Sequence, residues 1–280
     1  MTNRSKLLRA GALLLAGLML FSGLVYLFFP TDRVDQALAR QLEPQGLTLA
    51  PAVRKTLLPG LAWDNPLLAS PQGPLLQCRS VRVRPLLLPL LTGRAVISGT
   101  AAIGAGGLDI RYALNGRQAL ELSGSDINLS EIPFFKTVLG ATVSGVLWSQ
   151  GRLLREAGGL NGDLKLELRQ LAFSGVRLGT FPLPDAGGLT SQGMLRFTNG
   201  RARLESFTLA GEGLYMRLSG DLPNGANAGT TPLSLTLEIM PKAEFLEKQK
   251  LVFMLLAKFM VSPGVYKVPI RGTLLKPEIV

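Results

Sequence analysis

A run of 20 residues without a single charge, from Ala10 to Phe29, sets the first limit on how this chain is built. At a rise of about 1.5 Å per residue, an α-helix over this run is about 30 Å long, the hydrocarbon thickness of a bilayer. Basic residues precede the run, and no acidic residue does. By the positive-inside rule this basic flank stays in the cytoplasm and the chain after Pro30 is exported. The sequence therefore predicts a membrane anchor in residues 1–29, with Ala10, Leu13, Leu18, Phe21, Val25 and Phe29 among its apolar side chains.

A cleavable signal peptide is the alternative interpretation of this segment. Its apolar region should be shorter and should end in a small-x-small cleavage site. Here the run ends in Tyr26, Leu27, Phe28 and Phe29, which are bulky where a peptidase requires small side chains. The sequence therefore favours a single-pass anchor that is retained.

Beyond the anchor, the spacing of apolar residues changes twice. Residues 30–46 have Val34, Leu38 and Leu42 at helical spacing, which predicts a short helix and linker ended by Gly46. Residues 47–280 then alternate apolar and polar side chains in many short runs, as in residues 164–169 and 233–239. Alternation of this kind is typical of half-buried β-strands. Asn-Gly pairs at 115–116 and 199–200 predict hairpin turns, so we expect one mainly β, antiparallel domain over 47–280.

One late segment departs from this pattern. Lys242–Met260 has apolar side chains at helical spacing and predicts a single amphipathic helix. Two roles are open for this helix: packing on the sheet, or contact with a membrane surface or partner. The sheet itself has three options, because its apolar face must meet another sheet, curl on itself or remain an open trough.

Several classes of function are disfavoured by residue content. The chain has no histidine and a single cysteine, Cys78, which excludes a Ser-His-Asp triad, a Cys-His pair and zinc fingers. The net charge is +11, but no basic stripe interleaved with aromatic residues is present, so nucleic acid is not an expected partner. A catalytic pair among the mid-chain acids Asp126, Glu131, Glu156 and Asp163 is less favoured than turn positions for them. We expect a protein that is not an enzyme, with no cofactor and no metal.

The C-terminal 35 residues contain a more specific signal. They resemble the closing signature of the protein N family of type II secretion systems, in its variant with one anchor and one exported β-rich domain. A Leu-Pro-Gly segment near the start, at 58–60, fits the same layout. The residues that carry the resemblance are Ser262, Pro263, Gly264, Tyr266, Pro269, Ile270, Gly272, Thr273, Leu274 and Pro277.

The resemblance implies both a location and a fold. It places the anchor in the inner membrane of a two-membrane bacterial envelope and residues 47–280 in the periplasm. More distantly the chain is similar to AsmA-like proteins, which implies an elongated, curved antiparallel sheet, a half-barrel that forms a groove.

Two functions follow as hypotheses from this resemblance. In the first, the chain is a non-enzymatic scaffold or assembly factor that contacts other secretion components. In the second, it is an AsmA-like module that binds or transfers lipid, with acyl chains as partners. A scaffold should close its apolar face into a core, whereas a lipid carrier should leave a continuous apolar strip exposed.

Overall fold

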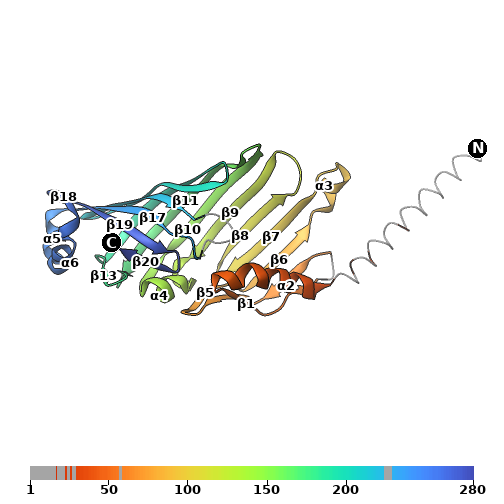
Figure 1. Cartoon of the computed structure of the whole chain (residues 1–280), viewed down its shortest axis with the longest axis horizontal. Coiled ribbons are helices and arrows are strands. Elements are labelled where there is room, and N and C mark those ends of the chain that lie inside the picture. Colours follow the sequence, from red (N-terminus) through yellow and green to blue (C-terminus); the bar gives the residue numbers. More distant parts are fainter. Residues whose placement is uncertain (1–16, 18–22, 24–25, 27–29, 57–58, 224–228) are drawn as a thin grey trace, which may run out of the picture.

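One antiparallel sheet of 15 strands dominates the computed structural model, which describes residues 17, 23, 26, 30–56, 59–223 and 229–280. Its path runs β18-β19-β17-β16-β15-β14-β11-β10-β9-β8-β7-β6-β3-β2, and β20 pairs with β19. The two ends of the path are not joined, so the sheet is open (Figure 1). The prediction of a mainly β, antiparallel domain is therefore confirmed. The strands are β2 (Arg54–Lys55), β3 (Leu61–Asp64), β6 (Ser80–Pro85), β7 (Val96–Ile103), β8 (Gly106–Ala113), β9 (Gln118–Asn128), β10 (Thr142–Glu156), β11 (Gly159–Ser174), β14 (Ala186–Thr198), β15 (Arg201–Gly211), β16 (Leu214–Leu222), β17 (Ser234–Pro241), β18 (Met260–Ser262), β19 (Val265–Thr273) and β20 (Lys276–Ile279).

Both Asn-Gly pairs form hairpin turns, as predicted. Asn199 and Gly200 join β14 to β15 with φ values of 52° and 76°, the left-handed conformation that a type I′ turn requires. Asn115 lies between β8 and β9, and its side chain holds the turn before β7. Its Oδ1 accepts a hydrogen bond from Ala95 N at 2.9 Å, and its Nδ2 donates one to Gly93 O at 2.8 Å.

The segment after Pro30 forms the expected short helix and then a small separate sheet. Helix α2 (Thr31–Leu42) and the 3-10 turn η1 (Glu43–Gln45) end at Gly46, whose φ of 69° suits glycine. Asp35 on α2 accepts hydrogen bonds from the backbone N–H of Val53 at 3.0 and 3.2 Å. The small sheet has the order β1-β4-β5, with bounds β1 (Thr48–Ala50), β4 (Leu67–Ser70) and β5 (Gly73–Gln77).

The two faces of the large sheet differ in what covers them. Leu76 of β5 packs with Val81, Ala101 and Leu108, which lie on one face of the large sheet, and we call this the inner face. The core residues Phe253 and Leu256 cover the same face near the C-terminus. Four short elements contribute residues to the same core: η2 (Leu129–Glu131), α4 (Phe134–Leu139), β12 (Arg177–Leu178) and β13 (Phe181–Pro182). A further short helix, α3 (Leu87–Leu91), lies between β6 and β7 in the chain.

The late amphipathic helix is divided, and in this respect the prediction is wrong. Lys242–Met260 contains α5 (Ala243–Lys248), α6 (Lys250–Leu255) and the turn η4 (Ala257–Phe259), with a break at Gln249. The Gln249 side chain donates to Asp185 O at 2.6 Å and accepts from Asp185 N at 2.8 Å. Its own backbone lies outside the helical region, at φ −122° and ψ 35°. A continuous helix is thus replaced by two short ones that follow the end of the sheet.

Candidate functional site

The inner face of the large sheet carries an unbroken cross-strand row of apolar residues. In an antiparallel sheet, directly paired residues lie on the same face, so the pairing register identifies the row. It runs from β3 to β19 with one residue on each strand, and every member is Leu, Ile, Val or Gly. We call it the apolar row; its members are Leu61, Val83, Gly99, Ile110, Leu122, Gly151, Leu164, Leu195, Leu204, Gly220, Leu235 and Ile270.

Neighbouring rows on the same face extend this surface. One of them contains a single polar side chain, Ser149, among the residues Trp63, Val81, Ala101, Leu108, Gly124, Leu166, Gly193, Phe207, Leu218, Leu237 and Val268. The row on the other side includes Ile97, Tyr112, Leu120, Leu153, Phe197 and Leu222. Three adjacent rows are therefore apolar over most of the width of the sheet.

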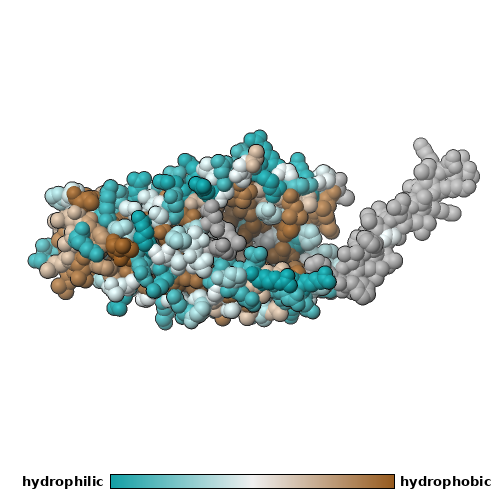
Figure 2. Space-filling view, viewed as in Figure 1, coloured by the Kyte–Doolittle hydropathy of each residue, from teal (hydrophilic) through white to brown (hydrophobic). Residues whose placement is uncertain are grey.

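The apolar row has a closed part and an open part. Leu204, Leu235 and Ile270 are buried, with 7%, 7% and 6% of their surface exposed. From Val83 on β6 to Leu195 on β14, all members remain partly exposed. We call this open part the trough, with Val83, Ile110, Leu122, Leu164 and Leu195 along its floor. Figure 2 shows apolar side chains gathered in a hollow of the molecule beside the polar α2.

Glycines on the inner face allow large side chains of neighbouring strands to lie close to the backbone. A Cβ atom on Gly193 would lie 2.5 Å from Cδ2 of Phe207, so the Phe207 ring occupies the space above this glycine. A Cβ atom on Gly151 would lie 2.8 Å from Cδ1 of Leu164 in the same way. Glycine in a strand interior often marks such a close approach. The inner surface is thus deepened where the glycines occur.

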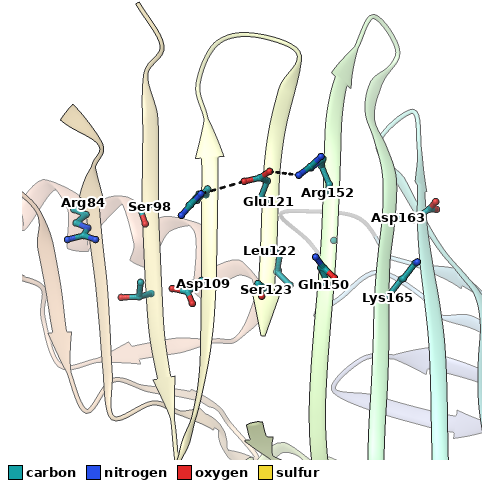
Figure 3. A pocket seen from close by; sticks show the side chains of 13 residues that line it. Arg84, Ser98, Asp109, Glu121, Leu122, Ser123, Gln150, Arg152, Asp163 and Lys165 are labelled. Carbon is teal, nitrogen blue, oxygen red and sulfur yellow. Dashed lines mark ion pairs between the residues drawn. The ribbon is translucent and has the colours of Figure 1, made fainter. Parts of the chain in front are cut away.

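The outer face of the same strands carries charges instead. A second cross-strand row contains both positive and negative side chains, and we call it the charged row. Glu121 pairs with Arg152 at 2.9 Å, as Figure 3 shows, and with Arg111 at 4.0 Å. The members of the charged row, in strand order, are Arg84, Ser98, Arg111, Glu121, Arg152, Asp163, Arg196, Arg203 and Asp221.

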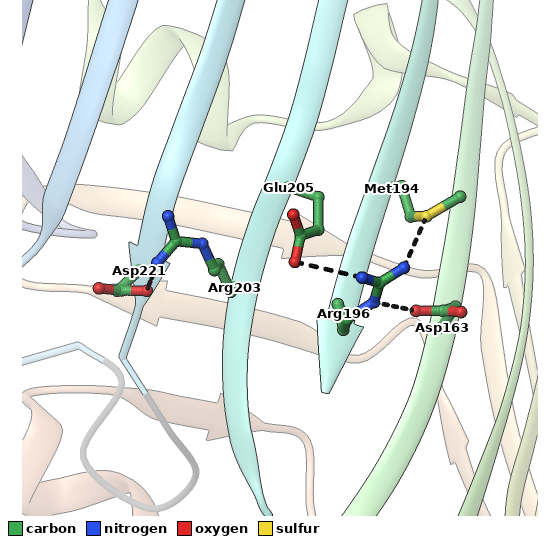
Figure 4. Close-up of polar contacts among 6 residues, drawn as sticks. All are labelled: Asp163, Met194, Arg196, Arg203, Glu205 and Asp221. Carbon is green, nitrogen blue, oxygen red and sulfur yellow. Dashed lines mark hydrogen bonds and ion pairs between the residues drawn. The ribbon is translucent and has the colours of Figure 1, made fainter. Parts of the chain in front are cut away.

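The charged row continues as ion pairs over β11 to β16. Arg196 Nε donates to Asp163 Oδ1 at 3.0 Å, and its Nη1 lies 3.6 Å from Glu205 Oε1 (Figure 4). The hydrogen bond from Arg196 to Asp163, together with the negative charges of Asp163 and Glu205, raises the pKa of Arg196. Arg203 pairs with Asp221 at 3.2 Å. These pairs are exposed to solvent, so they contribute solubility and register more than stability.

Two of the mid-chain acids lie in ion pairs with arginines. Asp163 belongs to the charged row, and Glu156 lies 3.7 Å from Arg117. Among the residues that the structure describes, no group of three or more Cys, Asp and Glu side chains could hold a metal ion. Cys78 is buried with Ile103 and Ile127, and this burial raises the pKa of its thiol.

The predicted anchor lies mostly outside the described residues, including Ala10, Leu13, Leu18, Phe21, Val25 and Phe29. Of the helices that the structure describes, none has the length and apolar character needed to span a bilayer. Tyr26 is described, and its hydroxyl lies within hydrogen-bond distance of the carbonyl oxygens of Thr56 and Gly60. This contact joins the end of the uncharged run to the turn between β2 and β3.

The C-terminal motif forms the last three strands of the sheet. Pro263 and Gly264 make the turn from β18 to β19, with a Gly264 φ of 73°. Tyr266 is buried against Phe253, with ring centroids 5.2 Å apart. Pro269 pairs with Thr236 of β17. On the other side of β19, Pro269 lies between the residues that pair with β18 and those that pair with β20. β19 is not an edge strand, because β17 lies on one side of it and β18 and β20 lie on the other.

The remaining motif residues form a hairpin that the sequence did not predict. After β19 the chain turns once more, and β20 pairs with β19. Gly272 has a φ of 85°, and a Cβ atom there would lie 2.2 Å from Lys276 O, so the two backbone segments approach each other closely. Thr273 Oγ1 accepts a hydrogen bond from Lys276 N at 3.2 Å. Ile270 and Ser262 lie on β19 and β18, Leu274 packs against the core, and Pro277 pairs with Gly272.

Sequence reasoning left open whether the inner face is a core or a trough, and it assigned no role to α3. The alternating strands were visible, but their alignment into rows depends on pairings between distant segments. The signal for α3 was present as four leucines in Leu87–Leu91. Comparison of the chain with protein-family models, with curated proteins and with solved structures gave no match.

Proposed function

We propose that this chain is a membrane-anchored protein of the bacterial envelope that binds lipid acyl chains in the trough. In this proposal residues 10–29 span the inner membrane, the N-terminus lies in the cytoplasm and residues 47–280 lie in the periplasm as an AsmA-like groove. The observation that carries it is the apolar row, which crosses the sheet without interruption and remains partly exposed from β6 to β14. The protein acts by binding, with no catalytic residue, cofactor or metal.

The dimensions of the trough suit an acyl chain. From β6 to β14 the sheet order contains seven strands, and six spacings of about 4.8 Å give a floor about 29 Å long. One leaflet contributes about half of the 30 Å hydrocarbon core of a bilayer, so an acyl chain fits within this length. Each methylene buried on the apolar floor contributes about 0.8 kcal/mol. An acyl chain therefore gains more from the trough than a polar ligand does.

A role in type II secretion is the second candidate, and the C-terminal end of the sheet favours it. The resemblance to protein N rests on β18, β19 and the following hairpin, so the motif builds a surface at one end of the molecule. Leu251, Met254 and Val261 are exposed there. In this proposal the C-terminal end contacts other secretion components as a scaffold or assembly factor, while the trough remains the lipid site.

Photo-crosslinking from neighbouring positions tests the lipid proposal. Leu122 and Ser123 lie next to each other on β9 but on opposite faces, and Leu164 and Lys165 do so on β11. A photoreactive phenylalanine analogue at each of these four positions, in the full chain within its native membrane, reports what touches each face. We expect lipid adducts from Leu122 and Leu164 and several-fold fewer from Ser123 and Lys165, measured by mass spectrometry.

The paired design separates a specific site from general contact with lipid. Equal lipid adducts from both faces would contradict the proposal, because bulk membrane or detergent would then account for the contact. Protein adducts alone from Leu122 and Leu164 would identify the trough as a docking surface and would favour the scaffold role. A photoreactive residue in place of Leu251 tests that role directly, since a scaffold should crosslink there to secretion components.

A further inference from the structure

Helix α3 leaves large apolar side chains exposed at one end of the sheet. Leu88 is 79% exposed, and Leu87 and Leu90 are also largely exposed. Leu114, which follows β8, is also exposed, and its N–H donates to Ala95 O at 2.8 Å, four residues after the end of α3. We call Leu87, Leu88, Leu90 and Leu114 the foot. Exposed side chains of this size that gather in one place mark a contact surface.

The chain around the foot is basic. No Asp or Glu occurs between Asp64 and Asp109, and the same interval contains Arg79, Arg82, Arg84 and Arg94. Arg84 lies three residues before α3 and Arg94 three residues after it, and both are exposed. Apolar side chains bordered by arginines suit the boundary between anionic headgroups and acyl chains. The charge of this end therefore favours a lipid surface over a neutral or basic protein.

The foot lies at the end of the molecule where the uncharged run joins the sheet. Tyr26 bonds to the carbonyl groups of Thr56 and Gly60. Gly60 in turn lies against β6, where its Cβ position is 2.9 Å from Val83 O and 3.2 Å from Arg84 Cβ. Helix α3 begins three residues after Arg84. Figure 1 shows α3 and the start of α2 at the same end of the sheet, with α5 and α6 at the other end.

We infer that the foot inserts into the periplasmic surface of the membrane that holds residues 10–29, where its leucines enter the acyl region and Arg84 and Arg94 bind anionic headgroups. This rests on the anchor of the proposed function, but not on lipid in the trough. The anchor and the foot together make two attachments at one end of the sheet. They fix its orientation to the bilayer and bring the β6–β7 end of the trough against the lipid.

Fluorescence quenching of the full chain in proteoliposomes tests the inference. The vesicles contain equal parts of phosphatidylcholine and phosphatidylglycerol. Cys78→Ala removes the native thiol, and Leu88→Cys or Leu251→Cys then carries an environment-sensitive dye. Leu251 is the matched control, because it is 78% exposed and lies on α6 at the opposite end. We expect quenching by lipids with doxyl-labelled acyl chains to be several-fold stronger at position 88 than at 251, and quenching by iodide in water to be stronger at 251.

Each result has a defined meaning. If position 88 responds to iodide as strongly as 251 and not to doxyl lipids, the foot lies in water and the inference is wrong. If 88 is protected from both quenchers, a second copy or another protein covers it, which also overturns the inference. Loss of the chain from the vesicles in a carbonate wash would overturn the anchor and the foot together. Pure phosphatidylcholine vesicles should weaken the doxyl effect, and an unchanged effect would remove the role of the arginines.

Discussion

The two parts of the apolar row have the same composition and different environments. From β6 to β14 the row forms the floor of an open trough, whereas Leu204, Leu235 and Ile270, on β15, β17 and β19, are buried. In the buried part, Leu235 and Ile270 pack with Phe253, Leu256 and Ile279, which come from α6, the residue that follows it and β20. The difference is one of cover. An apolar strand face becomes a core only where other elements of the chain reach it.

The outer face of the sheet supports the same conclusion. The charged row crosses both parts and has ion pairs in each, with Arg152 near Glu121 and Arg203 near Asp221. The strands are therefore built alike across the sheet, and the change from trough to core is confined to the inner face. This separation allows each part to be tested with matched substitutions.

The largest expected effect compares one leucine from each part of the apolar row. Leu235→Ala should lower the free energy of unfolding by about 2–5 kcal/mol, because it removes a buried side chain and leaves a cavity. Leu164→Ala should cost about 1 kcal/mol or less, since Leu164 is already partly exposed in the trough. Urea denaturation of the full chain in detergent, followed by the fluorescence of its two tryptophans, measures both. Equal losses would mean that the trough is a closed core in solution.

The next effect concerns the hairpin that closes the buried part. Gly272→Ala should cost about 1–3 kcal/mol, because the residue has a positive φ and its Cβ would collide with Lys276 O. Gly264→Ala is the control: its φ of 73° is also positive, but nothing lies within 4 Å of the added Cβ. The same denaturation measurement should give the smaller loss for Gly264→Ala. A Gly272→Ala protein as stable as the Gly264→Ala protein would contradict the close approach.

The arrangement of strands was largely accessible from sequence. Alternation in residues 164–169 and 233–239 and the Asn-Gly turns at 115–116 and 199–200 all fall where strands and hairpins occur. Each of these signals is local, because a turn or an alternating run depends on adjacent residues. Local signals therefore predicted a mainly β, antiparallel fold.

The division of the late helix and the trough depend on contacts between distant residues. The break at Gln249 follows from its bonds to Asp185, 64 positions away, and no helical periodicity could reveal that partner. The trough exists because Leu122, Leu164 and Leu195 are aligned by strand pairing and remain partly exposed. The sequence could not distinguish a closed core from an open trough, because both require the same alternation of apolar and polar residues.

Cys78 tests whether the trough end of the molecule also has a small core of its own. The thiol is buried with Ile103 and Ile127, and desolvation raises its pKa. At pH 8 the folded protein therefore has less thiolate than the unfolded chain, so alkylation by iodoacetamide should be at least about tenfold slower than in urea, a factor worth about 1.4 kcal/mol. The folded rate should rise as the pH approaches the raised pKa. An equal rate in the folded protein and in urea would show that this cluster opens freely.

The smallest effect is expected on the outer face, where the two parts should behave alike. Arg152→Gln and Arg203→Gln each remove one member of an exposed ion pair, with Glu121 at 2.9 Å and Asp221 at 3.2 Å. Each should lower the free energy of unfolding by less than about 1 kcal/mol, and high salt should erase the loss because it screens exposed charges. Denaturation in low and high salt measures both variants. If Arg152→Gln alone lowered the free energy of unfolding by a large amount that persisted in high salt, the charged row would stabilise the trough but not the buried part. In that case the contrast between the two parts would not be confined to the inner face.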